Sequence, residues 1–157
     1  MIKKALVVAL ILLALVGFVG CPSANTETSS PANVNTIRET NISPDWTMKQ
    51  MEITLEAETS IMLTLAPGDK VDGYFYVVSG DNISFSISGN SLIYESKAAG
   101  TAAESVSSDR FSFTASQAQG LSYRLKLTPG SGIASATVFL ELIYPASGEI
   151  FIPIGTQ

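Results

Sequence analysis

Residues that could do chemistry are scarce in this chain of 157 residues, which has no His and only one Cys, Cys21. Catalytic triads that depend on His, and cysteine nucleophiles activated by a His base, are therefore excluded. A disulfide within the chain is also impossible, and a zinc site built from soft ligands is not expected. The sequence predicts no catalytic residue and no cofactor.

Oxygen donors are the remaining candidates for acid–base or metal chemistry. A carboxylate pair could serve a glycosidase, and calcium takes about six to eight oxygens gathered at one point. The candidate side chains are Asp69, Asp72, Asp81, Asn82, Glu95 and Asp109. They fall at turn signals or on the wet side of predicted strands, without the spacing of a calcium loop, and Asp and Asn favour turns for backbone reasons alone. We therefore expect neither an enzyme nor a metal site.

Three aromatic residues are candidate ligand-binding residues. Tyr74 and Tyr76 alternate with Phe75, so they lie on the opposite face of one strand, which would expose them together near Trp46 if nothing covers that face. An exposed aromatic strip suits carbohydrate or peptide binding. The sequence favours the other arrangement, in which another strand or the tail covers this face and Trp46 packs on the edge of the domain.

The single thiol lies at the end of an apolar run. Lys3 and Lys4 are followed by apolar and small residues from Ala5 to Gly20, immediately before Cys21. This order is typical of a secretory signal peptide. A transmembrane helix is the alternative, but 16 residues would span only about 24 Å of a hydrocarbon core that is roughly 30 Å thick.

The residues Phe18-Val19-Gly20-Cys21 resemble the lipobox of bacterial lipoproteins, with Phe18 at the position where Leu is usual. That resemblance implies a diacylglycerol on the Cys21 thiol and cleavage of the chain before Cys21. The two acyl chains would anchor the protein, because two chains hold a protein on a bilayer much more firmly than one. The expected location is the extracytoplasmic face of the cell membrane.

The segment after Cys21 is polar. From Pro22 to about Ser43 it is rich in Ser, Thr, Asn and Pro, which favours a flexible tether with a reach of roughly 25 Å. The predicted organisation is a signal peptide over residues 1–20, a lipidated Cys and disordered linker over 21–50, and one folded domain over 51–157.

Beyond Met51 the hydrophobic pattern has a period of two. It recurs in about eight short segments separated by turn signals, which predicts an all-β, antiparallel sandwich. The cleanest examples are Ile83, Phe85 and Ile87. The composition of Ser79-Gly80-Asp81-Asn82 suits a hairpin before that strand, and Pro153 predicts that the last strand is an edge strand.

The order of features in residues 61–144 is similar to that of the GOLD-domain family, a β-sandwich known from cargo receptors of the early secretory pathway. The resemblance rests on Pro67-Gly68-Asp69, Val71-Asp72-Gly73-Tyr74-Phe75, Ser79-Gly80-Asp81-Asn82 with the strand Ile83-Ser84-Phe85-Ser86-Ile87, Leu92-Ile93-Tyr94, Phe111-Ser112-Phe113-Thr114-Ala115, Gly120, Tyr123-Arg124-Leu125 and Leu142-Ile143-Tyr144. It implies a jelly-roll or GOLD-like module without catalytic residues that binds or presents other proteins.

The charge of the chain narrows its partners. Lys3 and Lys4 precede Cys21, so the rest of the chain has seven basic residues against 14 acidic residues, a net charge of −7. An acidic surface without a basic cluster disfavours nucleic acid. The expected partners are the membrane, through the lipid, and another protein, with a carbohydrate or solute as the alternative ligand.

Overall fold

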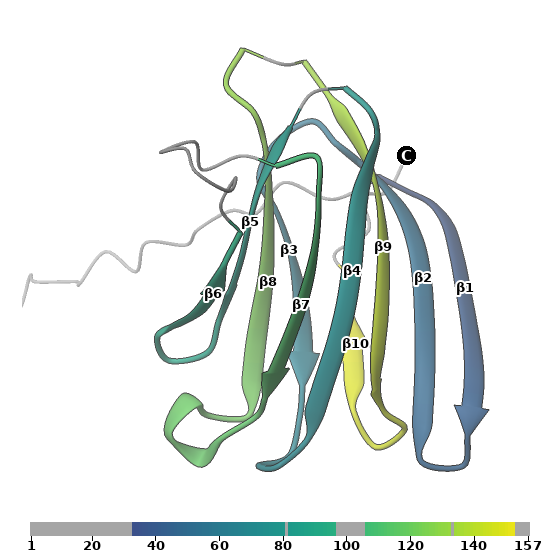
Figure 1. Ribbon diagram of the computed structural model, residues 1–157, viewed down its shortest axis with the longest axis vertical. Coiled ribbons are helices and arrows are strands. Elements are labelled where there is room, and N and C mark those ends of the chain that lie inside the picture. The colour runs from purple at the N-terminus through teal and green to yellow at the C-terminus, as the bar shows by residue number, and fades with distance from the viewer. Residues whose placement is uncertain (1–32, 81, 97–105, 133, 153–157) are drawn as a thin grey trace, which may run out of the picture.

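The computed structural model describes residues 33–80, 82–96, 106–132 and 134–152, which form ten β-strands and one 3₁₀ turn (Figure 1). The elements are β1 (Asn33–Ser43), β2 (Trp46–Leu55), β3 (Thr59–Thr64), β4 (Lys70–Ser79), β5 (Ile83–Ser88), β6 (Leu92–Glu95), β7 (Ser108–Thr114), η1 (Gln117–Gln119), β8 (Ser122–Pro129), β9 (Ala136–Pro145) and β10 (Glu149–Phe151). The prediction of an all-β, antiparallel fold is confirmed, with ten strands where the sequence indicated about eight.

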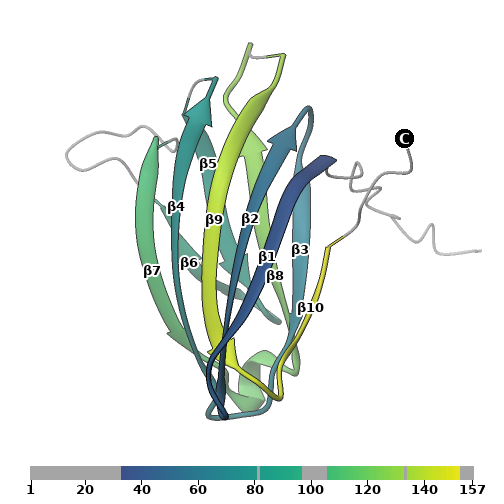
Figure 2. The same ribbon diagram turned by 90° about the vertical axis from the view of Figure 1, so that its right-hand side faces the viewer.

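The strands form two five-stranded antiparallel sheets. One has the order β1-β2-β9-β4-β7 and the other the order β10-β3-β8-β5-β6. Only β1–β2 and β5–β6 follow each other along the chain and pair in one sheet, while the other connections cross from one sheet to the other. In Figure 2, β7, β4, β9, β2 and β1 follow one another from left to right in front, and the strands of the other sheet lie behind and to the right.

The core lies between the sheets and follows the period of two. In β5 and β9 alternate residues are buried without exception. Phe75 of β4 contacts Phe85 of β5 across the layers, with ring centroids 4.8 Å apart. Burying a side chain of this size contributes about 1.5–3 kcal/mol, so this alternating set holds the sandwich together.

The hairpin predicted at 79–82 is wrong. β4 pairs with β9 and β7, whereas β5 pairs with β8 and β6 in the other sheet. The sequence of a turn does not distinguish a hairpin from a crossing between layers, because both need a residue such as Gly80, which has φ of +93°.

The prediction of a linker over residues 21–50 is also wrong where the structure describes the chain. Residues 33–50 form β1 and the first half of β2. Side chains join the two strands, since Lys49 Nζ lies 2.8 Å from Glu39 Oε2 and Thr47 Oγ1 donates to Asn41 Oδ1 at 3.2 Å. A polar strand with little apolar surface of its own becomes ordered here because its backbone pairs with β2. The signal segment, Cys21 and the rest of the linker lie outside the described residues.

The two sides of the sandwich differ. On the side of β6 and β7, the Tyr94 hydroxyl donates to Asp109, and the rings of Tyr94, Phe85 and Phe111 contact one another. On the other side, β1 and β10 are the two sheet edges (Figure 2). No helix in the part of the chain that the structure describes is long and apolar enough to cross a bilayer.

Candidate functional site

The acidic residues considered as metal ligands are spread over the fold and have local partners. Asp69 Oδ2 accepts from the Ala66 amide at 2.8 Å, Asp72 lies 3.1 Å from Lys70 Nζ, and Asp109 accepts from Tyr94. The Ser112 hydroxyl, and then Lys70, lower the pKa of Asp72 against the opposing effect of burial. Among residues 33–80, 82–96, 106–132 and 134–152, no group of three such side chains could hold a metal ion. Asp81 is outside these ranges.

The outward side of the sheet β1-β2-β9-β4-β7, called the outer face below, collects side chains from five strands in rows. The registers place Arg38, Gln50, Glu141, Tyr74 and Arg110 in one row, in that order across the sheet. The next row contains Glu52, Phe139 and Tyr76. Residues from both halves of the chain therefore meet on one surface.

Four of these residues form a continuous series, called the aromatic ladder below. The Arg110 guanidinium lies 4.9 Å from the centroid of the Tyr74 ring, and the Tyr74 and Tyr76 centroids are 5.9 Å apart. Tyr76 stacks on Phe139 with centroids 5.0 Å apart and an interplanar angle of 27°. The prediction that Tyr74 and Tyr76 are together on the face opposite Phe75 is confirmed, and Tyr76 is 39% exposed.

The orientation of the rings limits what they can bind. Side chains stand roughly perpendicular to a sheet, and Tyr76 and Phe139 meet face to face across neighbouring strands. Their flat faces therefore point along the sheet, while ring edges and hydroxyls point outward. A cation over the face of Tyr74 adds attraction of about 0.5–1 kcal/mol and covers that face.

Trp46 shares the outer face but lies apart from the ladder. It starts β2 and pairs with Pro145, four residues along the strand from Gln50, the residue in the row of Tyr74. This offset is about 14 Å along the strands and two strand spacings of about 4.8 Å across them. The structure thus does not join Trp46, Tyr74 and Tyr76 into one compact platform.

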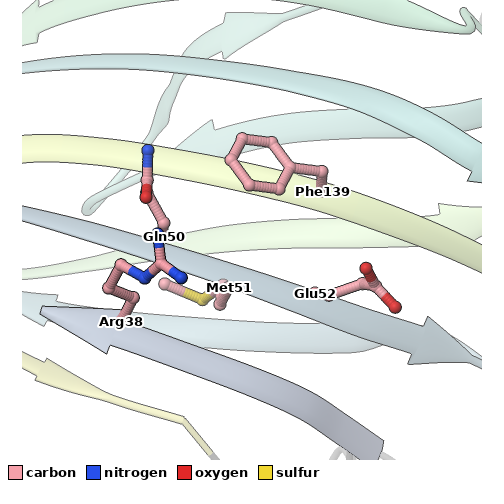
Figure 3. Close-up of a pocket in the computed structure, with 5 residues that line it drawn as sticks. All are labelled: Arg38, Gln50, Met51, Glu52 and Phe139. Carbon is pink, nitrogen blue, oxygen red and sulfur yellow. The ribbon is translucent and has the colours of Figure 1, made fainter.

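A hollow of about 180 Å³ lies beside the ladder, lined by Arg38, Gln50, Met51, Glu52 and Phe139 (Figure 3). Gln50 Nε2 donates to Glu141 Oε2 at 2.7 Å. Arg38 and Glu52 form no ion pair or hydrogen bond with another described residue. Figure 3 shows the Arg38 guanidinium beside Gln50 and Met51, while the Glu52 carboxylate points away from them. The hollow therefore combines a cation, a carboxylate and an apolar ring.

Charge is balanced on the outer face and not elsewhere. Its basic side chains are Arg38, Lys70 and Arg110, and its acidic ones are Glu52, Asp72 and Glu141. The other charged residues among those described comprise three basic and eight acidic side chains. A partner of either sign meets least repulsion at the outer face.

A second depression, called the edge cleft below, has a volume of about 400 Å³ between β1–β2 and β10. Its lining residues are Glu39, Lys49, Thr64, Tyr144, Gly148, Glu149, Ile150 and Phe151. The Lys49 side chain is only 14% exposed and pairs with Glu39. Burial, and then the negative charge of Glu39, raise the pKa of Tyr144.

Several residues of these surfaces were not predicted from the sequence. Phe139 lies between Thr137 and Glu141 on the wet side of its strand, and an aromatic residue at such a position is a usable signal. Arg38 and Arg110 carry no such signal, because only the strand register places them beside β2 and Tyr74.

Neither a family model nor a curated protein matches the chain.

Proposed function

We propose that this chain is an exported lipoprotein whose GOLD-like, jelly-roll sandwich is a non-catalytic protein-interaction module on the extracytoplasmic face of a cell membrane. The anchor rests on the lipobox-like segment that ends at Cys21 and on the apolar run before it. The binding role rests on the aromatic ladder.

The anchor would keep the sandwich close to the bilayer. Eleven residues lie between Cys21 and Asn33, where β1 begins, so the chain makes 12 steps from one Cα to the other and the two are at most about 43 Å apart in any conformation. The folded module would therefore meet partners that lie in the membrane or just outside it.

The aromatic ladder is the single observation that carries the binding role. Tyr, Phe and Arg are enriched in protein-binding surfaces, where they act as anchors surrounded by polar residues. Sugars instead stack on open ring faces, and the contacts of Tyr76 with Phe139 and of Tyr74 with Arg110 use ring faces within the molecule. This favours a protein partner over the alternative, a carbohydrate or solute held by Trp46, Tyr74 and Tyr76.

The anchor is tested by metabolic labelling with a radioactive fatty acid. We expect label on the wild-type chain and none on Cys21→Ser. Label that persists on Cys21→Ser would exclude this thiol as the lipid acceptor.

The binding surface is tested by affinity capture from native membranes with the full lipidated chain. We expect the captured protein to be lost with Tyr74→Ser and Tyr76→Ser and retained with Ser86→Ala, a matched change on the outward side of β5 in the other sheet. A glycan array probed with the same variants tests the alternative. Glycan binding that is lost with Tyr74→Ser would support a carbohydrate ligand.

A further inference from the structure

β1 is an unpaired sheet edge. It ends the order β1-β2-β9-β4-β7, and among the described residues its backbone bonds only to β2. Its register with β2 is regular from Thr36 to Asn41, between two irregularities at Val34/Thr36 and Asn41/Ser43. In an antiparallel pair alternate residues direct their N–H and C=O groups away from the partner strand, so half of the residues in this regular stretch present these groups outward.

The other sheet edges are shorter or closed off. β6 and β10 have four and three residues, and β7 lies on the side that the Tyr94–Asp109 hydrogen bond closes. Natural edges are usually protected by short length, Pro, bulges or charged side chains, Lys above all. The regular stretch of β1 contains Arg38 and Glu39 but neither Lys nor Pro, and it leaves Ile37 45% exposed between the two irregularities.

A depression adjoins each side of this edge. Arg38 lines the hollow on the outer face, and the next residue, Glu39, lines the edge cleft on the inner side. Ile37 shares the inner side, since it pairs with the buried Met51. A strand added to β1 would therefore place successive side chains alternately beside the hollow and beside the cleft.

We propose that β1 binds an extended, antiparallel segment of a partner protein that has an acidic residue opposite Arg38, a basic residue opposite Glu39 and an apolar residue opposite Ile37. The backbone ladder supplies attraction, and directly opposed side chains supply selectivity. This inference rests on the proposed protein-binding function but uses a surface separate from the aromatic ladder.

A second copy of the chain fits this edge poorly. In an antiparallel pairing of two copies related by a twofold axis, directly opposed residues lie on the same face of the sheet. Their residue numbers are therefore both even or both odd. The two registers that use five residues of the regular stretch oppose Arg38 to Arg38 or Glu39 to Glu39, which like charges disfavour. Registers centred on Ile37 or Thr40 leave only three paired residues before an irregularity.

The test uses the full chain in detergent micelles and the end-blocked peptide STTKEVTS, whose Lys, Glu and Val fall opposite Glu39, Arg38 and Ile37. Hydrogen exchange read by NMR should slow at amides within residues 36–41 when the peptide is added. The control peptide STTEKVTS, with the two charges exchanged, should bind about tenfold more weakly, because two favourable pairs become unfavourable. Arg38→Glu should weaken STTKEVTS about fivefold and restore binding to STTKKVTS.

Three results would overturn the proposal. Edge amides of β1 already protected in the free chain would mean that the chain itself occupies the edge. Protection that rises with protein concentration would mean that a second copy does. Equal affinity for both peptides would remove the predicted selectivity. Tyr74→Ser separates this inference from the proposed function, because it should abolish partner capture while leaving the peptide titration of β1 unchanged.

Discussion

Gly73→Ala should destabilise the sandwich, because the ring of Phe111 lies directly over Gly73. A Cβ at position 73 would lie 2.1 Å from Phe111 Cζ, so the ring would have to withdraw by about 1.5 Å to reach normal contact. Phe111 is 4% exposed, and its centroid lies 4.8 Å from that of Phe85, which leaves it little room to move. Overpacking of this kind costs about 1–3 kcal/mol. We expect a loss of about 2 kcal/mol in the free energy of unfolding.

The assay is urea unfolding of the full chain in micelles, followed by the fluorescence of its single Trp, Trp46. The corresponding shift in the thermal midpoint is about 8 °C for a domain of this size. Thr114→Ala, an exposed change on β7, is the control and should change stability by less than about 0.5 kcal/mol. Shortening the ring with Phe111→Leu should relieve the clash, so the double variant should be more stable than the sum of the two single losses predicts. Losses that simply add, or an unchanged stability of Gly73→Ala, would mean that the Phe111 ring does not restrict the space over Gly73.

Three further predictions concern the described side chains. Tyr94→Phe should cost about 0.5–1.5 kcal/mol through loss of the bond to Asp109. Burial, and then Asp109, raise the pKa of Tyr94 above its ordinary value, so the contribution of the Tyr94 hydroxyl to stability is fully present below about pH 10 and is lost as the pH rises further. From pH 9 to 11.5 the urea midpoint of Tyr94→Phe should therefore fall less than that of the wild type. Parallel curves of midpoint against pH would contradict this. Glu39→Gln should lower the pKa of Tyr144 in an ultraviolet titration, because it removes a nearby negative charge, and an unchanged curve would remove Glu39 as a cause. Tyr76→Ser should cost less than about 1.5 kcal/mol in urea unfolding, because its ring is partly exposed and stacks on one neighbour, and a larger loss would make the ladder a structural element more than a binding surface.

The period of two identified the core because it depends only on which face of a strand is buried. Ile83, Phe85 and Ile87 of β5 are all predicted and observed inside. The same alternation placed Tyr74 and Tyr76 on the outer face. The local sequence pattern was therefore sufficient to predict the buried face of every strand that has an apolar face of its own.

The first strand could not be predicted from composition. β1 is polar, and Ile37 and Ile42 remain about half exposed, so the segment has little apolar surface to reveal a strand. β1 is ordered by its backbone hydrogen bonds to β2 and by side-chain pairs such as Glu39–Lys49, which are contacts between two strands and not properties of one segment. The hollow and the edge cleft were missed for the same reason, since β1 lines both.

Pairing between distant strands explains the other differences. Phe139 and Tyr76 are 63 positions apart in the chain and meet because β9 lies between β2 and β4. The separation of Trp46 from Tyr74 follows from the same order of strands. Sequence spacing fixes the face on which a residue lies, whereas register fixes its neighbours.

Site-specific photo-cross-linking in native membranes shows whether a protein binds the outer face. A photoreactive phenylalanine analogue replaces Tyr76 on the outer face or, as the matched control, Ser86 on the outward side of the other sheet. We expect a discrete protein adduct from position 76 that Tyr74→Ser abolishes, and none from position 86. Equal adducts from both positions, or none from position 76, would contradict a protein-binding outer face.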